Sequence, residues 1–433
     1  MAGGIRQAAG RSLDAVDRGI VRVLRWRTPR EAPWSGVRLA LMWIVTRAVA
    51  LDLMIPWLGL SNDLSYYQKS ITGGSALIPA GLHEYPLPAL WLVSVPEAVA
   101  HGNPVTYKFV FIGMLLAVDI AFTWALHRWA TDPHSTTLWL AAGPCVGPLL
   151  FLRFDLVTGA AAGVSLLVLL TRPRLAGALA AIATALKLWP LLLLPLLAAP
   201  RAGRRRFAVG VLVVGGVLLV PTLAVGGIDR LVSPLRFQSA RGLHIESLAA
   251  LPLMFSWSLA HEPWEVRFSD TSFSQELHGP GVTAILVLST VATVAVAVLV
   301  LLLAVRLWHR GGAGVVEVGW AVVASCSMLV VVNKVFSPQY LLWLVPLGVA
   351  LVGVSDSRTS RRVATLLLLA GVAGQLVYPV TYNWIISPSG LSVVGVLLLS
   401  MRDVFVLAVA VVAAREAWRR SAPLPVASPA AVA

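Results

Sequence analysis

Long apolar segments recur along the whole chain and are separated by short segments that carry arginine. Of the 433 residues, 58% are hydrophobic and 12% are charged, and the mean hydropathy is +0.81. Soluble domains carry about 25% charged residues. A water-soluble fold of this length has no core large enough to bury so much apolar side chain. The sequence therefore predicts an integral membrane protein.

The lengths of the apolar segments predict an all-α polytopic bundle. A helix that spans a bilayer needs about 20 mainly apolar residues. This criterion predicts about twelve spans. They lie near 37–59, 86–101, 106–127, 136–152, 154–171, 175–199, 207–226, 281–305, 314–332, 338–355, 363–384 and 391–414.

Arginine clusters predict the orientation, because loops rich in Lys and Arg stay in the cytoplasm. By this rule 201–206, 306–312, 357–362 and 415–420 are cytoplasmic, whereas Arg172 and Arg174 fall on the outer side as an exception. The predicted domains are an N-terminal tail or surface helix over 1–36, a transmembrane domain over 37–415 and a disordered tail over 416–433. Both termini are expected to be cytoplasmic in a protein of the plasma membrane. The N-terminus has no apolar segment before residue 37, so we do not expect a cleaved signal peptide.

Two outer loops, 60–85 and 227–280, are far longer than connections in helical bundles usually are. Such long loops commonly carry function. The net charge of +14 follows from the topology rather than from nucleic-acid binding, since the arginines lie between apolar segments. Cys145 and Cys326 lie in apolar segments, and no acidic cluster stands in an outer loop. We therefore expect no disulfide, no metal and no cofactor.

The first outer loop begins with an acid. Asp63 follows Asn62, and Tyr66 and Tyr67 come three and four residues later. If Ser61 or Asn62 caps a short helix, Asp63 lies in its first turn and the two tyrosines share its side. Asp63 then either stabilises the helix dipole or acts as a general base that accepts a proton from a sugar hydroxyl.

The same loop ends in three further polar residues, His83, Glu84 and Tyr85, directly before Pro86. One interpretation is an ordinary helix start at the membrane interface, because proline suits the first helical turn. The other is that these residues, with Asp63, Tyr66 and Tyr67, bind a polyol such as a sugar.

The second outer loop and a later turn supply cations. Arg241, His244 and Glu246 precede a short apolar run, and Lys334 and Gln339 lie in the outer turn that follows another span. These charges are either simply solvated or snorkelling, or they bind the phosphate of a lipid carrier, for which arginine is well suited. Arg241, His244, Lys334 and Lys187 are the phosphate candidates, and Glu246 and Gln339 are candidates for the sugar.

Several charges lie inside apolar segments, where a lipid-facing position costs roughly 2.5–3.5 kcal/mol each. We expect most of them to face the protein interior. "LRFDLV" (152–157) and "ALKLWP" (185–190) fit the walls of a polar cavity, although Arg153 with Asp155, or Arg402 with Asp403, can equally form structural ion pairs. The charges are Arg47, Asp52, Asp119, Arg153, Asp155, Lys187, Glu317, Arg402 and Asp403.

Taken in order, these segments resemble glycosyltransferase family 87. The resemblance rests on the acid after the first span, "YP" at 85–86, "RFDLV" at 153–157, "KLWPLLLLP" at 187–195, "RGLHIESLAAL" at 241–251 and "NKVFSPQYLLWLVP" at 333–346. It spans about residues 37 to 415. The family comprises actinobacterial polyprenyl-phosphate-mannose-dependent α-1,2-mannosyltransferases of the GT-C membrane class.

The resemblance implies a GT-C-like bundle with a large outer cavity and a polyprenyl-phosphate-linked sugar donor. It also implies a lipid-linked or lipoglycan acceptor and an aspartate base in the first outer loop, a position that Asp63 matches. The expected reaction is an inverting mannosyl transfer on the extracytoplasmic face. Two alternatives stay open: the donor sugar is arabinofuranose on the same carrier, or the chain is a transporter of lipid or sugar without enzyme activity.

Overall fold

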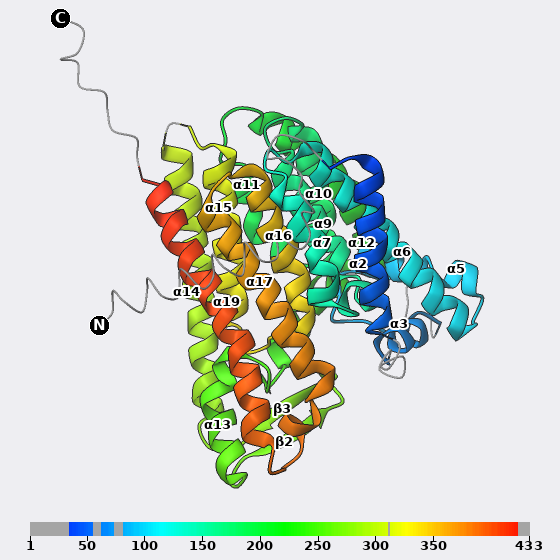
Figure 1. Cartoon of the computed structure of the whole chain (residues 1–433), viewed down its shortest axis with the longest axis vertical. Coiled ribbons are helices and arrows are strands. Elements are labelled where there is room, and N and C mark those ends of the chain that lie inside the picture. Colours follow the sequence, from blue (N-terminus) through cyan, green and yellow to red (C-terminus); the bar gives the residue numbers. More distant parts are fainter. Residues whose placement is uncertain (1–33, 55–61, 73–80, 311, 423–433) are drawn as a thin grey trace, which may run out of the picture.

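The computed structural model describes residues 34–54, 62–72, 81–310 and 312–422. It is a multi-pass helical bundle with one small three-stranded sheet (Figure 1), so the all-α prediction is correct except for the sheet. The N-terminal elements are α2 (Gly36–Asp52), α3 (Asn62–Thr72), α4 (Leu87–Ser94), α5 (Glu97–Ala100), α6 (Pro104–Trp129), α7 (His134–Val146), α8 (Leu149–Leu152), α9 (Asp155–Leu167), α10 (Pro173–Leu186), η2 (Trp189–Leu193) and α11 (Leu194–Leu197). The later elements are α12 (Arg204–Ala240), β1 (Leu243–His244), η3 (Leu248–Ala250), α13 (Leu251–Ala260), β2 (Glu265–Ser269), β3 (Ser274–His278), α14 (Val282–His309), α15 (Val315–Val332), η4 (Pro338–Tyr340), α16 (Leu341–Val354), α17 (Arg358–Gln375), η5 (Leu376–Val380), α18 (Asn383–Ile386) and α19 (Ser392–Arg420).

Within the described residues, six helices are long and apolar enough to cross a membrane: α6, α12, α14, α15, α17 with η5, and α19. Each coincides with a predicted span. The other predicted spans fall on shorter helices; that at 175–199, for example, is α10 as far as Leu186 and then η2 and α11. The total of about twelve spans therefore stays a prediction.

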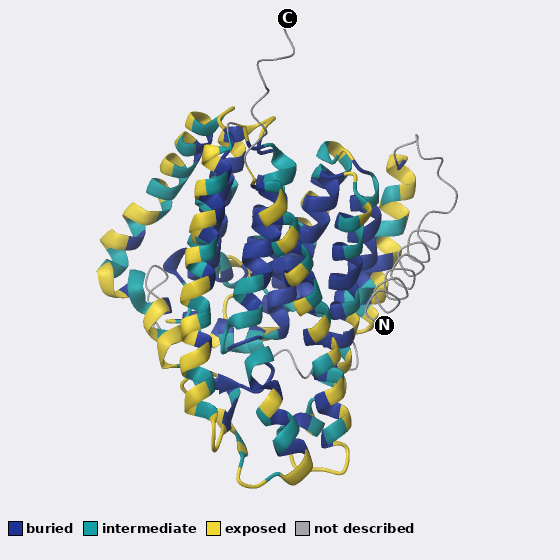
Figure 2. Ribbon diagram, turned by 90° about the vertical axis from the view of Figure 1, so that its left-hand side faces the viewer, coloured by how far each residue is buried: buried dark blue, intermediate teal, exposed yellow. Residues whose placement is uncertain are grey.

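The long helices divide the molecule into a buried interior and an apolar outer surface. Figure 2 shows buried residues along the centre of the bundle and exposed residues along its outer helices. The exposed faces of α12 and α14 are apolar, which suits contact with lipid rather than water. Their exposed side chains include Leu212, Val213, Val217, Val220, Val287, Leu288, Val291 and Val294.

The segment predicted as the outer loop 227–280 is largely regular structure. α12 is kinked at Gly227, whose φ of 64° and ψ of −171° are not helical and favour glycine, and its second helical part ends at Ala240. After it come β1, the short helices η3 and α13, and the hairpin β2–β3, with β3 central in the sheet. The sequence did not reveal this regular structure, because a helix that bends at glycine has the same local sequence signal as a helix that ends there. The outer position of the segment stays a prediction.

The two ends of the bundle differ in character. In Figure 1 the C-terminal ends of α14 and α19 lie at one end of the molecule, and α13, β2 and β3 lie at the opposite end. The last turns of α14 and α19 carry Arg306, His309, Arg419 and Arg420. α19 also runs to Arg420, past the predicted domain end at 415. The N-terminal tail prediction concerns residues 1–36, of which 1–33 lie outside the described residues.

A buried ion pair connects α2, α6 and α7, as the charges inside apolar segments predicted. Arg47 donates its Nε to Asp119 Oδ2 at 2.8 Å, and both side chains are buried. Trp43 and Trp139 donate indole N–H groups to the same carboxylate at 2.6 and 2.8 Å. Every carboxylate oxygen is thus bonded, which offsets the cost of burying the charge. Asp52, in contrast, is exposed.

A second cluster of buried charged side chains connects Glu246, which follows β1, to α19. Arg402 donates Nη1 to Glu246 Oε2 at 2.6 Å and also pairs with Asp403 at 2.9 Å. The predicted pair of Arg402 with Asp403 is therefore confirmed, and Glu246 joins it. Glu317 lies at the start of α15, where it accepts the backbone N–H of Gly314 at 3.0 Å.

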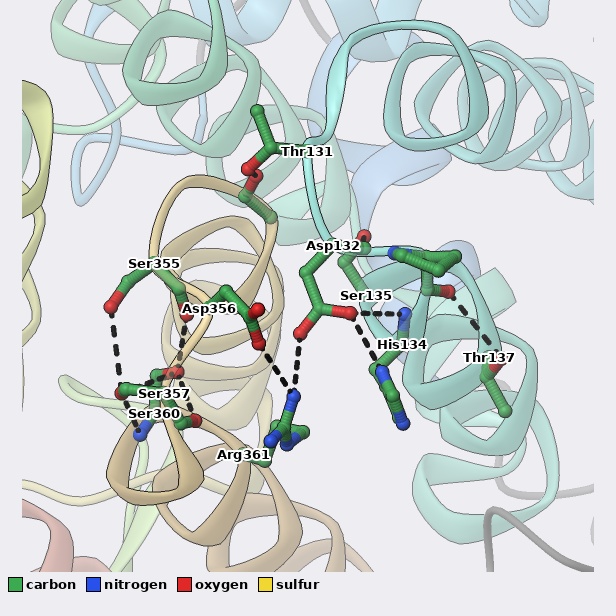
Figure 3. Close-up of polar contacts among 12 residues, drawn as sticks. Thr131, Asp132, His134, Ser135, Thr137, Ser355, Asp356, Ser357, Ser360 and Arg361 are labelled. Carbon is green, nitrogen blue, oxygen red and sulfur yellow. Dashed lines mark hydrogen bonds and ion pairs between the residues drawn. The ribbon is translucent and has the colours of Figure 1, made fainter. Parts of the chain in front are cut away.

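Polar contacts also join the α6–α7 connection to the turn between α16 and α17 (Figure 3). Thr131 donates its backbone N–H to Gly353 O at 2.7 Å. Asp132 accepts Arg361 Nη1 at 3.0 Å and lies 2.7 Å from His134 Nδ1. Since Arg361 belongs to the predicted cytoplasmic segment 357–362, these contacts brace that face of the bundle.

Candidate functional site

Asp63 lies in the first turn of α3, as predicted, and forms an ion pair with Arg153. The carboxylate of Asp63 joins Nη2 of Arg153 through Oδ2, and its side chain remains 32% exposed. Ser61, one of the two capping candidates, lies outside the described residues. The charge-assisted contact with the guanidinium orients the carboxylate of Asp63.

The segment between α8 and α9 holds two charged side chains with separate partners. Arg153 is extended, with φ −135° and ψ 125°, and α9 begins two residues later at Asp155. Asp155 accepts Lys187 Nζ at 2.8 Å and the indole N–H of Trp343 at 2.7 Å. The sequence was compatible with an ion pair between Arg153 and Asp155. In the structure Arg153 pairs with Asp63, and Asp155 pairs with Lys187.

Lys187 follows α10 directly and is surrounded by aromatic rings. Its ammonium lies 4.7 Å from the ring centroid of Tyr85, 5.2 Å from Phe154 and 5.4 Å from Trp343. These distances allow cation–π attraction. The side chain of Lys187 is only 10% exposed. Asp155 and the three rings compensate its charge.

A cavity of about 610 Å³ lies beside Lys187. Its walls come from the start of α4, the α10–η2 junction, the last turns of α12, the first half of α14, the end of α15 and the η4–α16 segment. Its polar lining residues are Glu84, Tyr85, Lys187, Gln238, Ser239, Arg241, Ser289, Thr290, Thr293, Asn333, Lys334, Gln339 and Tyr340. The cavity is large enough for a monosaccharide and a phosphate.

Arg241 and Lys334 form one side of this cavity. Lys334 Nζ donates to Ser239 O at 3.0 Å and to Arg241 O at 2.6 Å, so it caps the C-terminal end of α12. Burial, with the nearby charge of Arg241, lowers the pKa of Lys334. Neither Arg241 nor Lys334 forms an ion pair with an acidic side chain of the described residues, but Lys334 donates to two carbonyl oxygens, whereas the Nε of Arg241 is buried without a hydrogen-bond partner there.

His244 and Glu246 lie behind the cavity wall rather than in it. His244 is buried, and its backbone N–H donates to Lys334 O at 3.0 Å. Burial and the charges of Arg241 and Arg402 lower the pKa of His244 well below its ordinary range. The imidazole is thus neutral at physiological pH and supplies no positive charge. Burial raises the pKa of Glu246, which Arg402 binds.

The residues before α4 connect the cavity with α3. Tyr66 donates its hydroxyl to Glu84 Oε1 at 3.0 Å. Burial raises the pKa of Glu84, which lines the cavity. Tyr67 is fully buried among aromatic rings, and His83 Nδ1 lies 2.7 Å from Arg230 Nη1.

The predicted site residues therefore fall into two groups. The first lines the cavity: Glu84, Tyr85, Lys187, Arg241, Lys334 and Gln339. The second lies outside the lining: Asp63, Tyr66, Tyr67, His83, His244 and Glu246. Two connections join the groups. Tyr66 of α3 donates to Glu84 of the lining, and Arg153, the partner of Asp63, is two residues before Asp155, the partner of Lys187.

Sequence reasoning missed several polar lining residues. Ser289, Thr290 and Thr293 of α14 face the cavity, and their spacing within an apolar span is the signal that could have identified them. Gln238 carried no local signal, and Asn333 lies in the motif at 333–346 but was not predicted to be a site residue. Among the described residues, no group of three or more His, Cys, Asp or Glu side chains could hold a metal ion.

Comparison with known families adds independent evidence. The model of glycosyltransferase family 87 matches residues 83–338, which is more than half of the chain. The match covers every residue of the cavity lining from Glu84 to α15 and ends at Pro338, whereas Asp63 precedes it. A comparison with curated proteins finds no match. The chain therefore belongs to glycosyltransferase family 87.

Proposed function

We propose that this membrane glycosyltransferase moves a mannosyl residue from polyprenyl-phosphate-mannose to a lipid-linked or lipoglycan acceptor. The reaction takes place on the extracytoplasmic face of the plasma membrane, with both termini in the cytoplasm. The arginine-rich ends of α14 and α19 support this orientation, because they lie opposite the sheet and α13.

Asp63 acts as the general base. It accepts the proton of an acceptor hydroxyl while that oxygen attacks the anomeric carbon and the bond to the carrier phosphate breaks. A single displacement inverts the anomeric centre, so a β-linked donor gives an α-linked product. Polyprenyl phosphate leaves without protonation, and one carboxylate is sufficient, unlike the pair that glycosidases need.

The donor phosphate binds at Arg241. Three cations line the cavity, but the carboxylate of Asp155 compensates Lys187, and Lys334 uses its ammonium on two carbonyl oxygens. Arg241 has no carboxylate partner among the described residues, so an anion gains most there. Stabilising the charge that develops on the leaving phosphate is a large contribution to catalysis.

The lipid part of the donor lies against α12 and α14. These helices contribute Leu235 and Val294 to the cavity lining and expose apolar side chains on their outer faces. A prenyl chain can therefore remain in the membrane while its phosphate reaches the cavity. A free nucleotide sugar has no apolar chain that could bind to these side chains of α12 and α14.

The observation that carries the proposal is Arg241, a cation of the cavity lining whose Nε is buried without a hydrogen-bond partner among the described residues, in a member of family 87. The test is to incubate purified protein in detergent with radiolabelled polyprenyl-phosphate-mannose and a lipoglycan extract, and to identify the labelled product. A parallel reaction with polyprenyl-phosphate-arabinofuranose decides the sugar. Transfer of labelled mannose from polyprenyl-phosphate-mannose supports the proposal. Transfer from polyprenyl-phosphate-arabinofuranose alone, or from neither donor, contradicts it.

A further inference from the structure

The hairpin β2–β3 places an exposed aromatic ring at its turn. The strands pair antiparallel, with Ser269 opposite Ser274, and the turn between them carries Phe273. Phe273 is 55% exposed and has a φ of +48°. This backbone region is unfavourable for a bulky residue, and such positions persist where the surrounding structure fixes them, often at functional sites.

The ring of Phe273 lies against Tyr66 of α3. The two ring centroids are 4.7 Å apart and the planes are inclined by 42°. Tyr66 is three residues after Asp63 on the same helix, so the two side chains are neighbours, with about 5–6 Å between Cβ atoms. The Phe273–Tyr66 pair therefore stands beside the proposed base.

The turn is also tied to the wall of the cavity. Ser272 Oγ donates to Glu276 Oε1 at 2.7 Å and lies 2.8 Å from Ser274 Oγ. Glu276 accepts the backbone N–H of Gly242 at 2.9 Å, directly after Arg241. A Cβ at position 242 would lie 2.3 Å from Glu276 Oε2, so the carboxylate packs directly against the backbone of Gly242. The position of Phe273 is thus fixed relative to the proposed phosphate residue.

We propose that Phe273 and Tyr66 form a stacking subsite for the sugar ring of the acceptor. Ring C–H groups of a sugar carry partial positive charge and pack on the negative face of an aromatic ring. A sugar placed there has a hydroxyl beside Asp63, while the Tyr66 hydroxyl holds Glu84 at the cavity. This inference rests on the proposed transferase function and adds the residue that orients the acceptor.

The test measures acceptor kinetics with octyl α-mannoside as a probe and polyprenyl-phosphate-mannose as donor. Phe273→Ala is expected to raise the acceptor KM by about 3- to 10-fold, the range of an aromatic stacking interaction, with the donor KM unchanged. Phe273→Trp keeps a ring and should remain near wild type, whereas Phe273→Leu, which is apolar but not aromatic, should resemble alanine. Phe268→Ala is the matched control, because Phe268 is 54% exposed in the same hairpin and has no aromatic contact among the described residues.

An unchanged acceptor KM in both Phe273→Ala and Phe273→Leu overturns the subsite, as does an equal rise in Phe268→Ala. If the wild-type protein transfers no sugar, the proposed function fails, but the subsite can still be judged. Saturation-transfer NMR of octyl α-mannoside should then show ring-proton signals with wild type that weaken in Phe273→Leu and persist in Phe268→Ala. Equal signals in all three proteins contradict the inference.

Discussion

Asp63 of α3 and Arg153, which stands between α8 and α9, form an ion pair between segments that are distant in the sequence. The pair connects the carboxylate on the short helix α3 to the segment between α8 and α9. Arg153 is two residues before Asp155, the partner of Lys187 in the cavity wall. One short segment thus positions both the proposed base and a wall of the proposed donor cavity.

Replacing Arg153 by Gln should lower kcat more than it changes the donor KM, because the guanidinium positions the base rather than the donor. A base displaced by about 1 Å loses on the order of 10²-fold in rate. Arg153→Lys keeps the charge and should recover part of the loss. Steady-state kinetics on purified variants measure both parameters; a rise in donor KM with unchanged kcat would assign Arg153 to donor binding instead.

Replacing Arg241 by Ala should raise the donor KM by about 10- to 100-fold, the usual worth of hydrogen bonds to a charged group. Arg241→Lys should restore only part, since lysine cannot bind phosphate in a bidentate manner. Arg236→Ala is the control, because Arg236 pairs with Asp229 on the exposed side of α12 and does not line the cavity. Equal effects at Arg236 and Arg241 would mean that general surface charge, and not a phosphate site, explains the loss.

Asp155→Asn should destabilise the protein by about 3–5 kcal/mol, because it leaves the buried ammonium of Lys187 without a counter-charge. Removing both charges in Asp155→Leu with Lys187→Leu should cost less than the single substitution. Asp229→Asn breaks an exposed pair with Arg236 and should change stability by about 0–1 kcal/mol. Thermal unfolding in detergent ranks the three variants by stability. If Asp155→Asn is as stable as Asp229→Asn, the result contradicts a buried ion pair.

Glu84 should make stability depend on pH. Its pKa is raised by burial above the ordinary value of 4.5, so between 4.5 and the raised pKa the folded protein holds a proton that the unfolded chain has released. Stability contributed by this group is therefore present below 4.5 and is lost as the pH rises through the window. Glu84→Gln mimics the protonated form and should remove this part of the dependence. Unfolding temperatures of both proteins from about pH 4 to about pH 8 test it; parallel curves would contradict it.

Local patterns in the sequence predicted the elements whose signal is contained in a short segment. The position of Asp63 in the first turn of α3 is confirmed, because a capping residue followed by an acid is a local signal. The burial of Arg47 and Asp119 is confirmed, because a charge inside an apolar span must face a partner. The long spans were predicted correctly because a long apolar run is also a signal contained in one segment of the sequence.

Partners and tertiary contacts could not be predicted in this way. Arg153 and Asp155 are only two residues apart, yet they pair with different side chains, Asp63 and Lys187. His244 has the sequence signal of a cation, but burial next to Arg241 and Arg402 lowers its pKa and keeps it neutral. Both outcomes depend on neighbours that are far away along the chain.

The role of the carboxylate on α3 is tested most directly by mannosyl transfer in the purified Asp63→Asn variant, with Asp270→Asn, an exposed acid of the hairpin turn, as control. Loss of a general base lowers kcat by about 10²- to 10⁴-fold. We expect that loss for Asp63→Asn in a protein that is folded and still binds donor, and wild-type activity for Asp270→Asn. Undiminished transfer by folded Asp63→Asn would contradict the mechanism.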